Sequence, residues 1–445
     1  MQKKKFRKVR KQGRVVERLQ YAYDVFAFLL LISALDFLFY QVFGSRAESF
    51  GEVNGPRLAV SMVVYAIALI MSIYKIPAIK KVVSANLFLI PVFFLPLLSV
   101  LWSVDQKITL FRACAYLLSC TFSLYLVVSL KPEEFFRRAM VATFIGGVLS
   151  LAWVALSPAD AIHNGGPLAG AWKGVYGHKN DLGRIGSIAI VMSLFAEPTG
   201  KWQKLIRLAN IGIYIFLVIM SDSKTNWLIL LSMIGFIPLT KWLRNPATSP
   251  SLRLIAVGGG ATLISMLVIL NSSAILAAMG RDDSFSGRGT LWNGVSSIIA
   301  SKYPVLGAGY GAFFTDAGGV WDLKGYLRYW SSLPNHAHNG FLNVQADMGY
   351  PGLIVLITFL ILSAVRVVQK MIAEPYRPVW AGCAALLFLF IVNNISESNA
   401  FVHSDIPWIM LLVSYAYLAP AQKIAGVKKR GRKFRFRSLN DARPA

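Results

Sequence analysis

Charged residues are scarce in this sequence. Asp, Glu, Lys and Arg make up only 15% of its 445 residues, whereas a soluble domain carries about 25%. Hydrophobic residues reach 56%, and many of them stand in long runs without a charge. A chain of this length could otherwise form two or three soluble domains, but this composition argues against them and indicates a membrane protein.

Acidic residues are scarcer than basic ones, with 21 Asp and Glu against 46 Lys and Arg, which gives a formal net charge of +25. Such an excess also occurs in proteins that bind nucleic acid. Here the densest basic runs are Lys3–Arg18 and Lys428–Arg437, which flank apolar runs as cytoplasmic membrane anchors do. We therefore predict contact with the lipid bilayer and no nucleic-acid partner.

Cysteine is rare as well. Cys114, Cys120 and Cys383 all lie within apolar runs, where cysteine behaves as a small hydrophobic residue. Their spacing forms no pair of the kind that a zinc site or a disulfide framework needs. We predict no cofactor and no structural metal from these residues.

Long apolar runs are the main feature of the sequence. A membrane-spanning helix needs about 20 mostly apolar residues, and about twelve runs approach this length. The predicted fold class is therefore all-α, a polytopic membrane protein of about twelve transmembrane helices with a large, partly helical periplasmic loop. The predicted spans are 21–43, 58–75, 85–102, 109–130, 139–157, 183–197, 205–220, 225–242, 253–275, 350–366, 378–395 and 401–420.

The distribution of basic residues orients these spans, because cytoplasmic loops collect Lys and Arg. With the N-terminus inside, the inner loops hold Lys80, Lys81, Lys131, Arg137, Arg138, Lys201, Lys204, Arg207, Lys241, Arg244, Arg366 and Lys370. This predicts a protein of the bacterial inner membrane with both termini in the cytoplasm. The predicted organisation is a basic tail (1–20), nine spans (21–275), the periplasmic loop (276–349), three spans (350–420) and a second basic tail (421–445).

The long loop contains the segment Leu333-Pro334-Asn335-His336-Ala337-His338-Asn339-Gly340. We expect a helix to start here with Asn335 as its N-cap, which would point His336 and His338 to nearly opposite sides. His338 is then the candidate general base, since a neutral imidazole suits that task near pH 7. The alternative is a pair of capping or surface histidines. A metal site is the weaker interpretation, because His-x-His alone supplies too few ligands.

Arg281 and Arg288 precede this segment in the same loop. Arg288 and Trp292 are four residues apart, so a helix would place guanidinium and indole on one side. Arginine binds phosphate bidentately, and tryptophan offers a flat face to a sugar ring. Plain surface ion pairs are the alternative, above all for Arg281, which Asp282 and Asp283 follow.

Two further basic segments are predicted on the exported side. Lys224 directly precedes the span 225–242. Exported segments contain few Lys and Arg, so we expect this lysine either to bind an anion or to extend its side chain outward to the membrane surface. His178 and Lys179 belong to a polar segment that either lines the same cavity or enters a helix with Asn180 as its cap. Glu397, at the outer end of the span 378–395, is a candidate for orienting a histidine or accepting a proton.

Several motifs occur in a fixed order along the chain. They are Trp102-Ser103, Gly177-His178-Lys179-Asn180-x-Leu182-Gly183, Arg288-x-x-x-Trp292, Gly307-x-Gly309-x-Gly311, His336-x-His338-Asn339 and Gly349-x-x-Gly352. The glycines of 307–311 suggest turns and not a dinucleotide-binding loop, because no strand precedes them. Together the motifs resemble the O-antigen ligase and O-antigen polymerase superfamily of bacterial surface-polysaccharide proteins. The first two resemble its exopolysaccharide-polymerase branch, and the strongest similarity covers residues 170–360.

This resemblance implies a metal-independent glycosyltransferase that uses a sugar chain carried on undecaprenyl diphosphate. By analogy, His338 would be the base that activates an acceptor hydroxyl and Arg288 would hold the diphosphate leaving group. Lys224 stands where the family usually has arginine, and a lysine lacks the bidentate fork. His336, Asn339, Trp292, Arg281, His178 and Lys179 are the remaining candidate substrate-binding residues. A chain-length regulator or another polysaccharide-export protein is the expected protein partner.

Three functions stay open on the sequence alone. A polymerase joins lipid-linked repeat units, and we favour it on the His178 segment. A ligase moves the finished chain to lipid A-core. A twelve-helix transporter is the rival from another class, with Asp36 as its clearest intramembrane charge.

Topology is the first testable prediction. Alkaline phosphatase fused within residues 276–349 should be active and β-galactosidase at the same position inactive, because the segment is predicted to be exported. Fusions after Arg138 should give the reverse result and serve as the control. Activity of β-galactosidase within 276–349 would show that the histidine segment (residues 333–340) faces the cytosol, and the predicted exported site would then be wrong.

Overall fold

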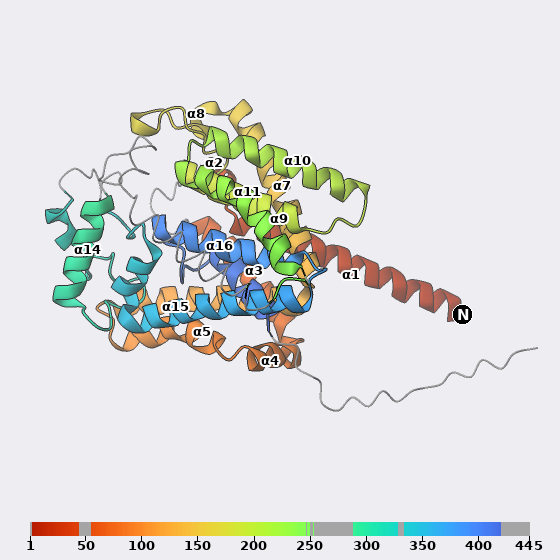
Figure 1. Cartoon of the computed structure of the whole chain (residues 1–445), viewed down its shortest axis with the longest axis horizontal. Coiled ribbons are helices and arrows are strands. Elements are labelled where there is room, and N and C mark those ends of the chain that lie inside the picture. Colours follow the sequence, from red (N-terminus) through yellow and green to blue (C-terminus); the bar gives the residue numbers. More distant parts are fainter. Residues whose placement is uncertain are drawn as a thin grey trace, which may run out of the picture.

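The computed structural model describes residues 2–43, 55–245, 247–249, 252, 288–327 and 333–419, with side chains from Val15 onward. Within these ranges the backbone is mainly helical, and the one β pairing recorded is an isolated bridge between Ile162 and Trp172. The helices are α1 (Gln2–Leu31), α2 (Asp36–Phe43), α3 (Gly55–Ile73), α4 (Ile76–Ala85), α5 (Leu89–Leu98), η1 (Ser99–Leu101), α6 (Gln106–Ser129), α7 (Pro132–Leu156), α8 (Pro158–Ala161), η2 (Gly166–Leu168), α9 (Lys179–Phe195), α10 (Lys201–Met220), α11 (Lys224–Arg244), α14 (Arg288–Lys302), η4 (Asp322–Gly325), α15 (Gly340–Ala373), α16 (Val379–Ser396) and α17 (Ile406–Tyr417) (Figure 1).

Many of these helices can cross a membrane. In the described residues seven are long and apolar enough, or up to nine if the bent pairs α1–α2 and α4–α5 each form one span. Helices α9 and α17 coincide with predicted spans but have only 17 and 12 residues. The predicted span 253–275 lies outside the described residues. The all-α, multi-pass architecture is confirmed, whereas a count of twelve spans is not.

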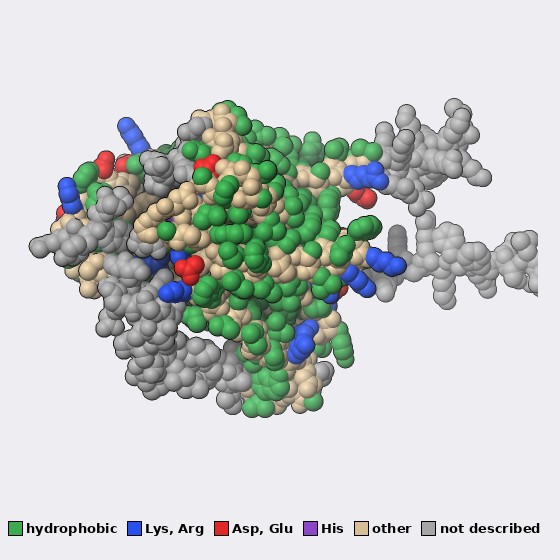
Figure 2. All heavy atoms as spheres, turned by 90° about the horizontal axis from the view of Figure 1, so that it is seen from above, with side chains coloured by type: hydrophobic (Ala, Val, Ile, Leu, Met, Phe, Trp, Pro, Cys, Tyr) green, Lys and Arg blue, Asp and Glu red, His purple; other side chains and the backbone are tan. Residues whose placement is uncertain are grey.

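The outer surface of the bundle matches that architecture. Figure 2 shows hydrophobic side chains as a broad band across the middle of the molecule, with charged side chains toward its two ends. Exposed members of this apolar surface include Ile70 on α3, Leu231 on α11 and Ile361 on α15. Apolar surface of this extent would be unfavourable in water, so lipid is the environment that suits it.

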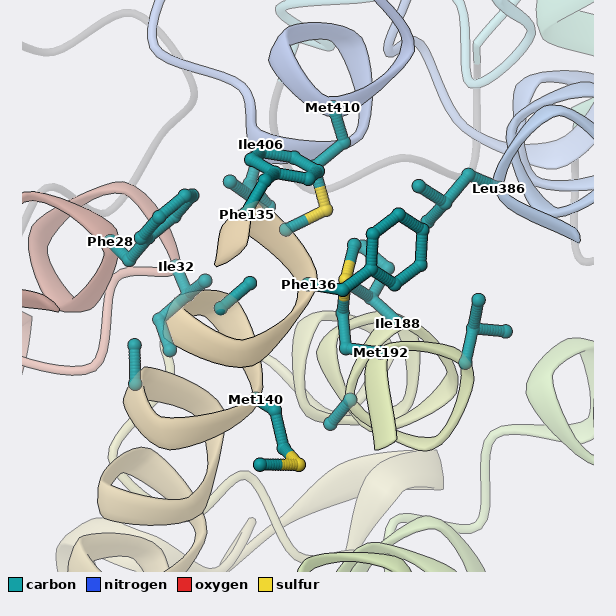
Figure 3. Packing of buried hydrophobic residues seen from close by; sticks show 14 of the residues in the cluster. Phe28, Ile32, Phe135, Phe136, Met140, Ile188, Met192, Leu386, Ile406 and Met410 are labelled. Atoms are coloured by element: carbon teal, nitrogen blue, oxygen red, sulfur yellow. The ribbon is translucent and has the colours of Figure 1, made fainter. Parts of the chain in front are cut away.

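The main core lies where α1, α7, α9, α16 and α17 meet. Figure 3 shows its packing, in which Phe28, Phe135, Phe136, Met192 and Met410 come from four of these helices and interlock. Phe28, Phe135 and Phe136 are fully buried. Close packing of large side chains holds these helices in fixed relative positions, and it therefore also fixes the polar segments at their ends.

The predicted large loop is partly helical, as expected. It contains α14 and η4 at one end of the bundle (Figure 1). Leu291, Val295, Phe313 and Leu323 form a small buried cluster in this part of the chain, and Ala346 on α15 joins it. This contact attaches α14 to the first turns of α15 and so positions the N-terminus of α14.

A kink at Gly349 divides α15 into a short outer part and a long apolar part. Gly349 has φ 60° and ψ −153°, a conformation that residues with a side chain rarely adopt. A Cβ at this position would overlap the carbonyl oxygen of Val305. That carbonyl accepts a hydrogen bond from the Tyr350 N–H at 2.9 Å, while the Gly309 N–H donates to the Asp347 carbonyl at 2.8 Å. The predicted glycine turns at 307–311 therefore pack against the kink.

Replacing Gly349 by alanine should destabilise the protein. The strained backbone alone costs about 1–3 kcal/mol, and the overlap with Val305 adds to that cost. The detergent-solubilised variant should therefore unfold at a lower temperature in a tryptophan-fluorescence melt. Gly212→Ala in α10 is the matched control, because among the described residues no atom outside the backbone of the same helix lies within 4 Å of the added Cβ. Equal melting temperatures for the two variants would contradict the prediction.

Candidate active site

The Glu397 side chain is the centre of the candidate site. It follows α16 directly, and its Oε1 accepts hydrogen bonds from Arg288 Nη2 and Asn180 Nδ2, each at 3.1 Å. Its Oε2 lies 3.2 Å from His338 Nδ1 and 3.7 Å from His336 Nε2. One carboxylate thus joins α9, α14, the histidine segment and α16, four segments that are far apart in the sequence. We call these five residues the Glu397 cluster.

The predicted start of the histidine helix is wrong. Helix α15 begins at Gly340, and its N-cap is Asn339, whose side-chain oxygen accepts from the Phe341 and Leu342 N–H groups at 3.1 Å each. His336 and His338 therefore precede the helix instead of lying on opposite sides of it. Their ring centroids are 4.0 Å apart, and both rings face Glu397.

Contacts with other residues hold the segment 333–339 in this non-helical form. The Ala337 N–H donates to the side chain of Asn343 at 3.0 Å, and the Trp292 indole N–H donates to the Ala337 carbonyl at 2.9 Å. His338 has φ 47°, a left-handed conformation that is costly for a residue with a side chain. Strain of this kind persists only where the surrounding structure enforces it, and it gathers at functional sites.

The contact with Glu397 assigns the tautomer of His338. An ionised carboxylate only accepts hydrogen bonds, so His338 Nδ1 must carry the proton that points at it. In the neutral ring the basic lone pair is then on Nε2. A carboxylate that orients one nitrogen while the other takes up a proton is the arrangement of a general base and its positioning group.

Charges within the cluster support this assignment. Burial raises the pKa of Glu397, but the contacts with His336 and His338 and the charge of Arg288 outweigh burial and hold this pKa well below its usual value. Burial lowers the pKa of His336 despite its contact with Glu397. Near neutral pH the cluster therefore contains an ionised carboxylate, a neutral His336 and the guanidinium of Arg288.

Arg288 and Trp292 lie at the start of α14, as predicted. Arg288 Nη1 donates to the Ser396 carbonyl at 2.7 Å, so the guanidinium bridges the last residue of α16 and the Glu397 carboxylate. It is mostly buried, with 14% of its side chain exposed, which excludes the plain surface ion pair that was its alternative. The Trp292 indole N–H donates a hydrogen bond to the Ala337 carbonyl, between the two histidines. Arg281 lies outside the described residues.

The start of α9 borders the same site. His178, and not Asn180, is the N-cap of this helix, and His178 Nδ1 accepts from the Asn180 N–H at 3.2 Å. The Asn180 side chain is thereby available to contact Glu397. Burial lowers the pKa of His178. The segment thus both enters a helix and lines the Glu397 cluster.

The predicted cations Lys179 and Lys224 are the first residues of α9 and α11. Lys179 Nζ lies 3.4 Å from Asp222 Oδ2 and donates to the Asp222 carbonyl at 3.1 Å. Lys224 is the first residue of α11, and the preceding Ser223 donates to Asn180 Oδ1 at 3.2 Å. These contacts bring the starts of α9 and α11 together.

A second group of polar residues, centred on Arg184, lies next to the Glu397 cluster and was not predicted from the sequence. Arg184 pairs with Asp181 at 2.9 Å and with Asp405 at 3.3 Å, and it donates to Asn399. Asn394 accepts from the Asn399 N–H at 3.1 Å. The four buried atoms Arg184 Nε, Asn394 Nδ2, Asn399 Nδ2 and Ser398 Oγ make no hydrogen bond with any residue that the structure describes. Unsatisfied buried donors are uncommon and indicate that water or a polar ligand completes the site.

His336, His338 and Glu397 could also hold a metal ion, since their ligand atoms lie within 4.8 Å of one another. The sequence argument against a metal assumed that no acidic residue lay beside the histidines, and Glu397 is such a residue. The Arg288 guanidinium, 3.1 Å from the same carboxylate, disfavours a second cation there. Metal independence stays a prediction.

Two comparisons with known proteins found similar sequences. A family model described as O-antigen ligase matches residues 209–357. The exopolysaccharide production protein ExoQ of Rhizobium meliloti (strain 1021) is 26% identical over 326 residues, an alignment that covers 69% of this chain and 70% of that protein. The family match contains Arg288 and the histidine segment but neither Asn180 nor Glu397.

The helical bundle and its apolar outer surface define a multi-pass membrane protein. The chain is similar to proteins of the O-antigen ligase and polymerase family, as its motifs suggested.

Glu397→Gln should shift the titration of His336 to lower pH. The carboxylate raises the pKa of this histidine, so its loss lets burial lower that pKa further. The pH dependence of acylation by diethyl pyrocarbonate, followed at His336 by peptide mass spectrometry, reports the neutral imidazole. Its midpoint should fall in Glu397→Gln and stay unchanged in Glu374→Gln, whose carboxylate pairs with Lys370 and Arg377. A rise of the midpoint in Glu397→Gln would disprove the assigned contact.

Proposed function

We propose that this protein polymerises oligosaccharide carried on undecaprenyl diphosphate at the periplasmic face of the bacterial inner membrane. The observation that carries the proposal is the Glu397 cluster, which places a candidate base, His338, and a candidate anion-binding group, Arg288, on the same carboxylate. The family match and the exopolysaccharide relative support the same class of chemistry.

In this proposal His338 Nε2 removes the proton of an acceptor sugar hydroxyl. The hydroxyl oxygen attacks the anomeric carbon of the donor, a C–O bond forms, and the bond between that carbon and the diphosphate oxygen breaks. The proton stays on His338, and Glu397 stabilises the imidazolium that results. Attack from the face opposite the leaving group inverts the anomeric configuration.

The leaving group is undecaprenyl diphosphate, which departs with the bonding electron pair. Arg288 neutralises the charge that builds on its oxygen, with Lys224 and Arg281 as the further predicted cations. The buried donors of Arg184, Asn394 and Asn399 offer additional hydrogen bonds to phosphate or sugar oxygens. Fixed cations can perform this task without a metal ion, which is why we propose a metal-independent reaction.

The proposed location follows from the charge pattern and from the substrate. Positively charged inner loops predict that the end bearing the Glu397 cluster is exported and that both termini are cytoplasmic. The donor's diphosphate stays at the bilayer surface while its tail remains in lipid, so lateral entry between helices would bring it to the polar end of the bundle. A chain-length regulator is the proposed protein partner.

Between the two acceptors, we favour a second lipid-linked repeat unit over lipid A-core. Support comes from the His178 segment, which borders the cluster, and from the relative, whose name refers to exopolysaccharide production. The ligase reaction uses the same base and the same leaving group, so a defined acceptor in the assay distinguishes the two.

The test uses purified protein, an undecaprenyl-diphosphate-linked repeat unit and a chelator, with polymer length read by electrophoresis. The wild type should extend the glycan. His338→Ala should lower the rate by about 10²–10⁴-fold, and Arg288→Ala by about 10²–10³-fold. His336→Ala should have a smaller effect, because its Nε2 is 3.7 Å from Glu397 and its role is to support the carboxylate.

Lys302→Ala is the matched control, since this lysine lies at the other end of α14 and pairs with Asp322 at the surface. It should retain full activity. Normal polymer from His338→Ala and Arg288→Ala at normal protein level would refute the catalytic proposal. Loss of wild-type activity in chelator, restored by a divalent cation, would refute metal independence.

A further inference from the structure

Two motifs of the sequence take no part in the reaction proposed above. Trp102-Ser103 holds the glycine turn (residues 307–311), because the Trp102 indole N–H donates to the carbonyl just before this turn at 2.8 Å. The turn in its turn lies against the outer part of α15. A Cβ on Gly307, which has φ 72°, would overlap the backbone of Asp347. Glycine thus allows a close approach here, and Asp347 is the residue of α15 at this contact.

The Asp347 side chain accepts hydrogen bonds from two segments. The residue is buried, with only 6% of its surface exposed. Its Oδ1 accepts from the Phe313 N–H at 3.4 Å, shortly after the glycine turn, and its Oδ2 accepts from Asn343 Nδ2 at 3.1 Å. Asn343 lies four residues earlier on α15, so the two side chains share one face of the helix. Asp347 therefore connects the glycine turn to Asn343.

The other end of the Asn343 amide binds the histidine segment. Asn343 Oδ1 accepts from the Ala337 N–H at 3.0 Å, between His336 and His338. A side-chain amide has one accepting and one donating end, whereas an ionised carboxylate only accepts. Asp347 therefore fixes Nδ2 of Asn343 toward itself and leaves Oδ1 for Ala337. With the amide reversed, two N–H groups would face each other at Ala337.

The peptide groups of Ala337 are held on both sides. Its N–H is bound by Asn343, and its carbonyl accepts from the Trp292 indole at 2.9 Å. Ala337 is fully buried, so its N–H needs a partner within the protein. The orientation of this backbone decides where the next ring, that of His338, points. The left-handed φ of 47° at His338 persists only because such contacts enforce it.

We infer that Asp347 is a positioning residue for the candidate base. Through Asn343 it fixes the backbone at Ala337, and with it the direction in which His338 presents Nε2 to an acceptor hydroxyl. The inference rests on the proposed function, in which His338 takes up that proton. Glu397 orients the His338 ring, while Asp347 orients the backbone that carries it. The glycine turn and Trp102-Ser103 serve the same end, because they hold the segment against which Asp347 packs.

Hydrogen exchange tests this connection without any assay of activity. The full-length protein in lipid nanodiscs is labelled near pH 8, where an aspartate is largely ionised, and the Ala337 amide is resolved by electron-transfer fragmentation. Asp347→Asn puts a donor where an acceptor is needed, so this amide should exchange about tenfold faster than in the wild type. An unchanged exchange rate would overturn the inference.

Asp322→Asn is the matched control for that experiment. Asp322 belongs to the same large loop, but its carboxylate pairs with Lys302 at the surface at 2.8 Å. The substitution removes the same charge and should leave exchange at Ala337 as in the wild type. Equal acceleration in both variants would show a general loosening of the loop and would count against a specific role of Asp347.

The polymerisation assay tests the role in catalysis. Asp347→Asn should lower kcat by about tenfold and leave the KM of the lipid-linked donor within about twofold, because only the alignment of the base changes. The solvent deuterium isotope effect on kcat should rise, since proton transfer to a misaligned base becomes slower. A raised KM with an unchanged isotope effect would indicate damage to donor binding and would overturn the inference.

A double-mutant cycle tests whether Asp347 acts through Asn343. Asn343→Ala should reproduce the fall in kcat, and adding Asp347→Asn to it should cause no further fall. The paired substitution Asn343→Asp with Asp347→Asn again gives each N–H an acceptor, so it should restore protection at Ala337 and most of kcat. This pair also provides the test if Asp347→Asn alone does not fold.

Additive losses in the cycle, or an unprotected Ala337 amide in the paired substitution, would overturn the inference. Failure of the wild type to form polymer would refute the proposed function instead. Exchange at the Ala337 amide would then still decide whether Asp347 holds the histidine segment.

Discussion

A largely enclosed carboxylate must be compensated, and the Glu397 cluster depends on this constraint, because only 21% of the Glu397 side chain is exposed. Removing an ionised carboxylate from water costs several kcal/mol unless charges and hydrogen bonds replace the solvent. Glu397 meets this requirement only when Arg288, Asn180 and the two histidines approach it together. The burial of one charge therefore brings four separate segments to one point. The same contacts that stabilise the fold here also orient the candidate base.

Much of the fold could be predicted because its signals are local. A long uncharged run identifies a membrane helix without any knowledge of its neighbours, and all predicted spans within the described residues coincide with helices or bent pairs. The exact number of crossings does not follow in this way. Helices α9 and α17 are short and largely enclosed by other helices, so neither length nor apolar character alone shows whether they cross.

The site was only partly predictable, because its geometry arises from contacts between distant residues. Arg288, His336, His338 and His178 were recognised from their type and position, and the structure brings them to one region. The start of the histidine helix was misplaced, since Asn335 and Asn339 are equally good caps in the sequence. The choice depends on how Trp292 and Asn343 hold Ala337, which no local pattern reveals. Asn394 and Asn399 gave no signal, because single asparagines at helix ends are common.

The division of the Glu397 cluster among α9, α14, the histidine segment and α16 limits how such proteins can diversify. The large loop is not a separable module, because Asn180 and Glu397 remain on the membrane bundle when the loop is exchanged. In a chimera that receives the loop of a distant relative, the side chains of that loop must therefore fit the Asn180 and Glu397 of the recipient bundle. New specificity in this architecture requires the bundle and the loop to change together.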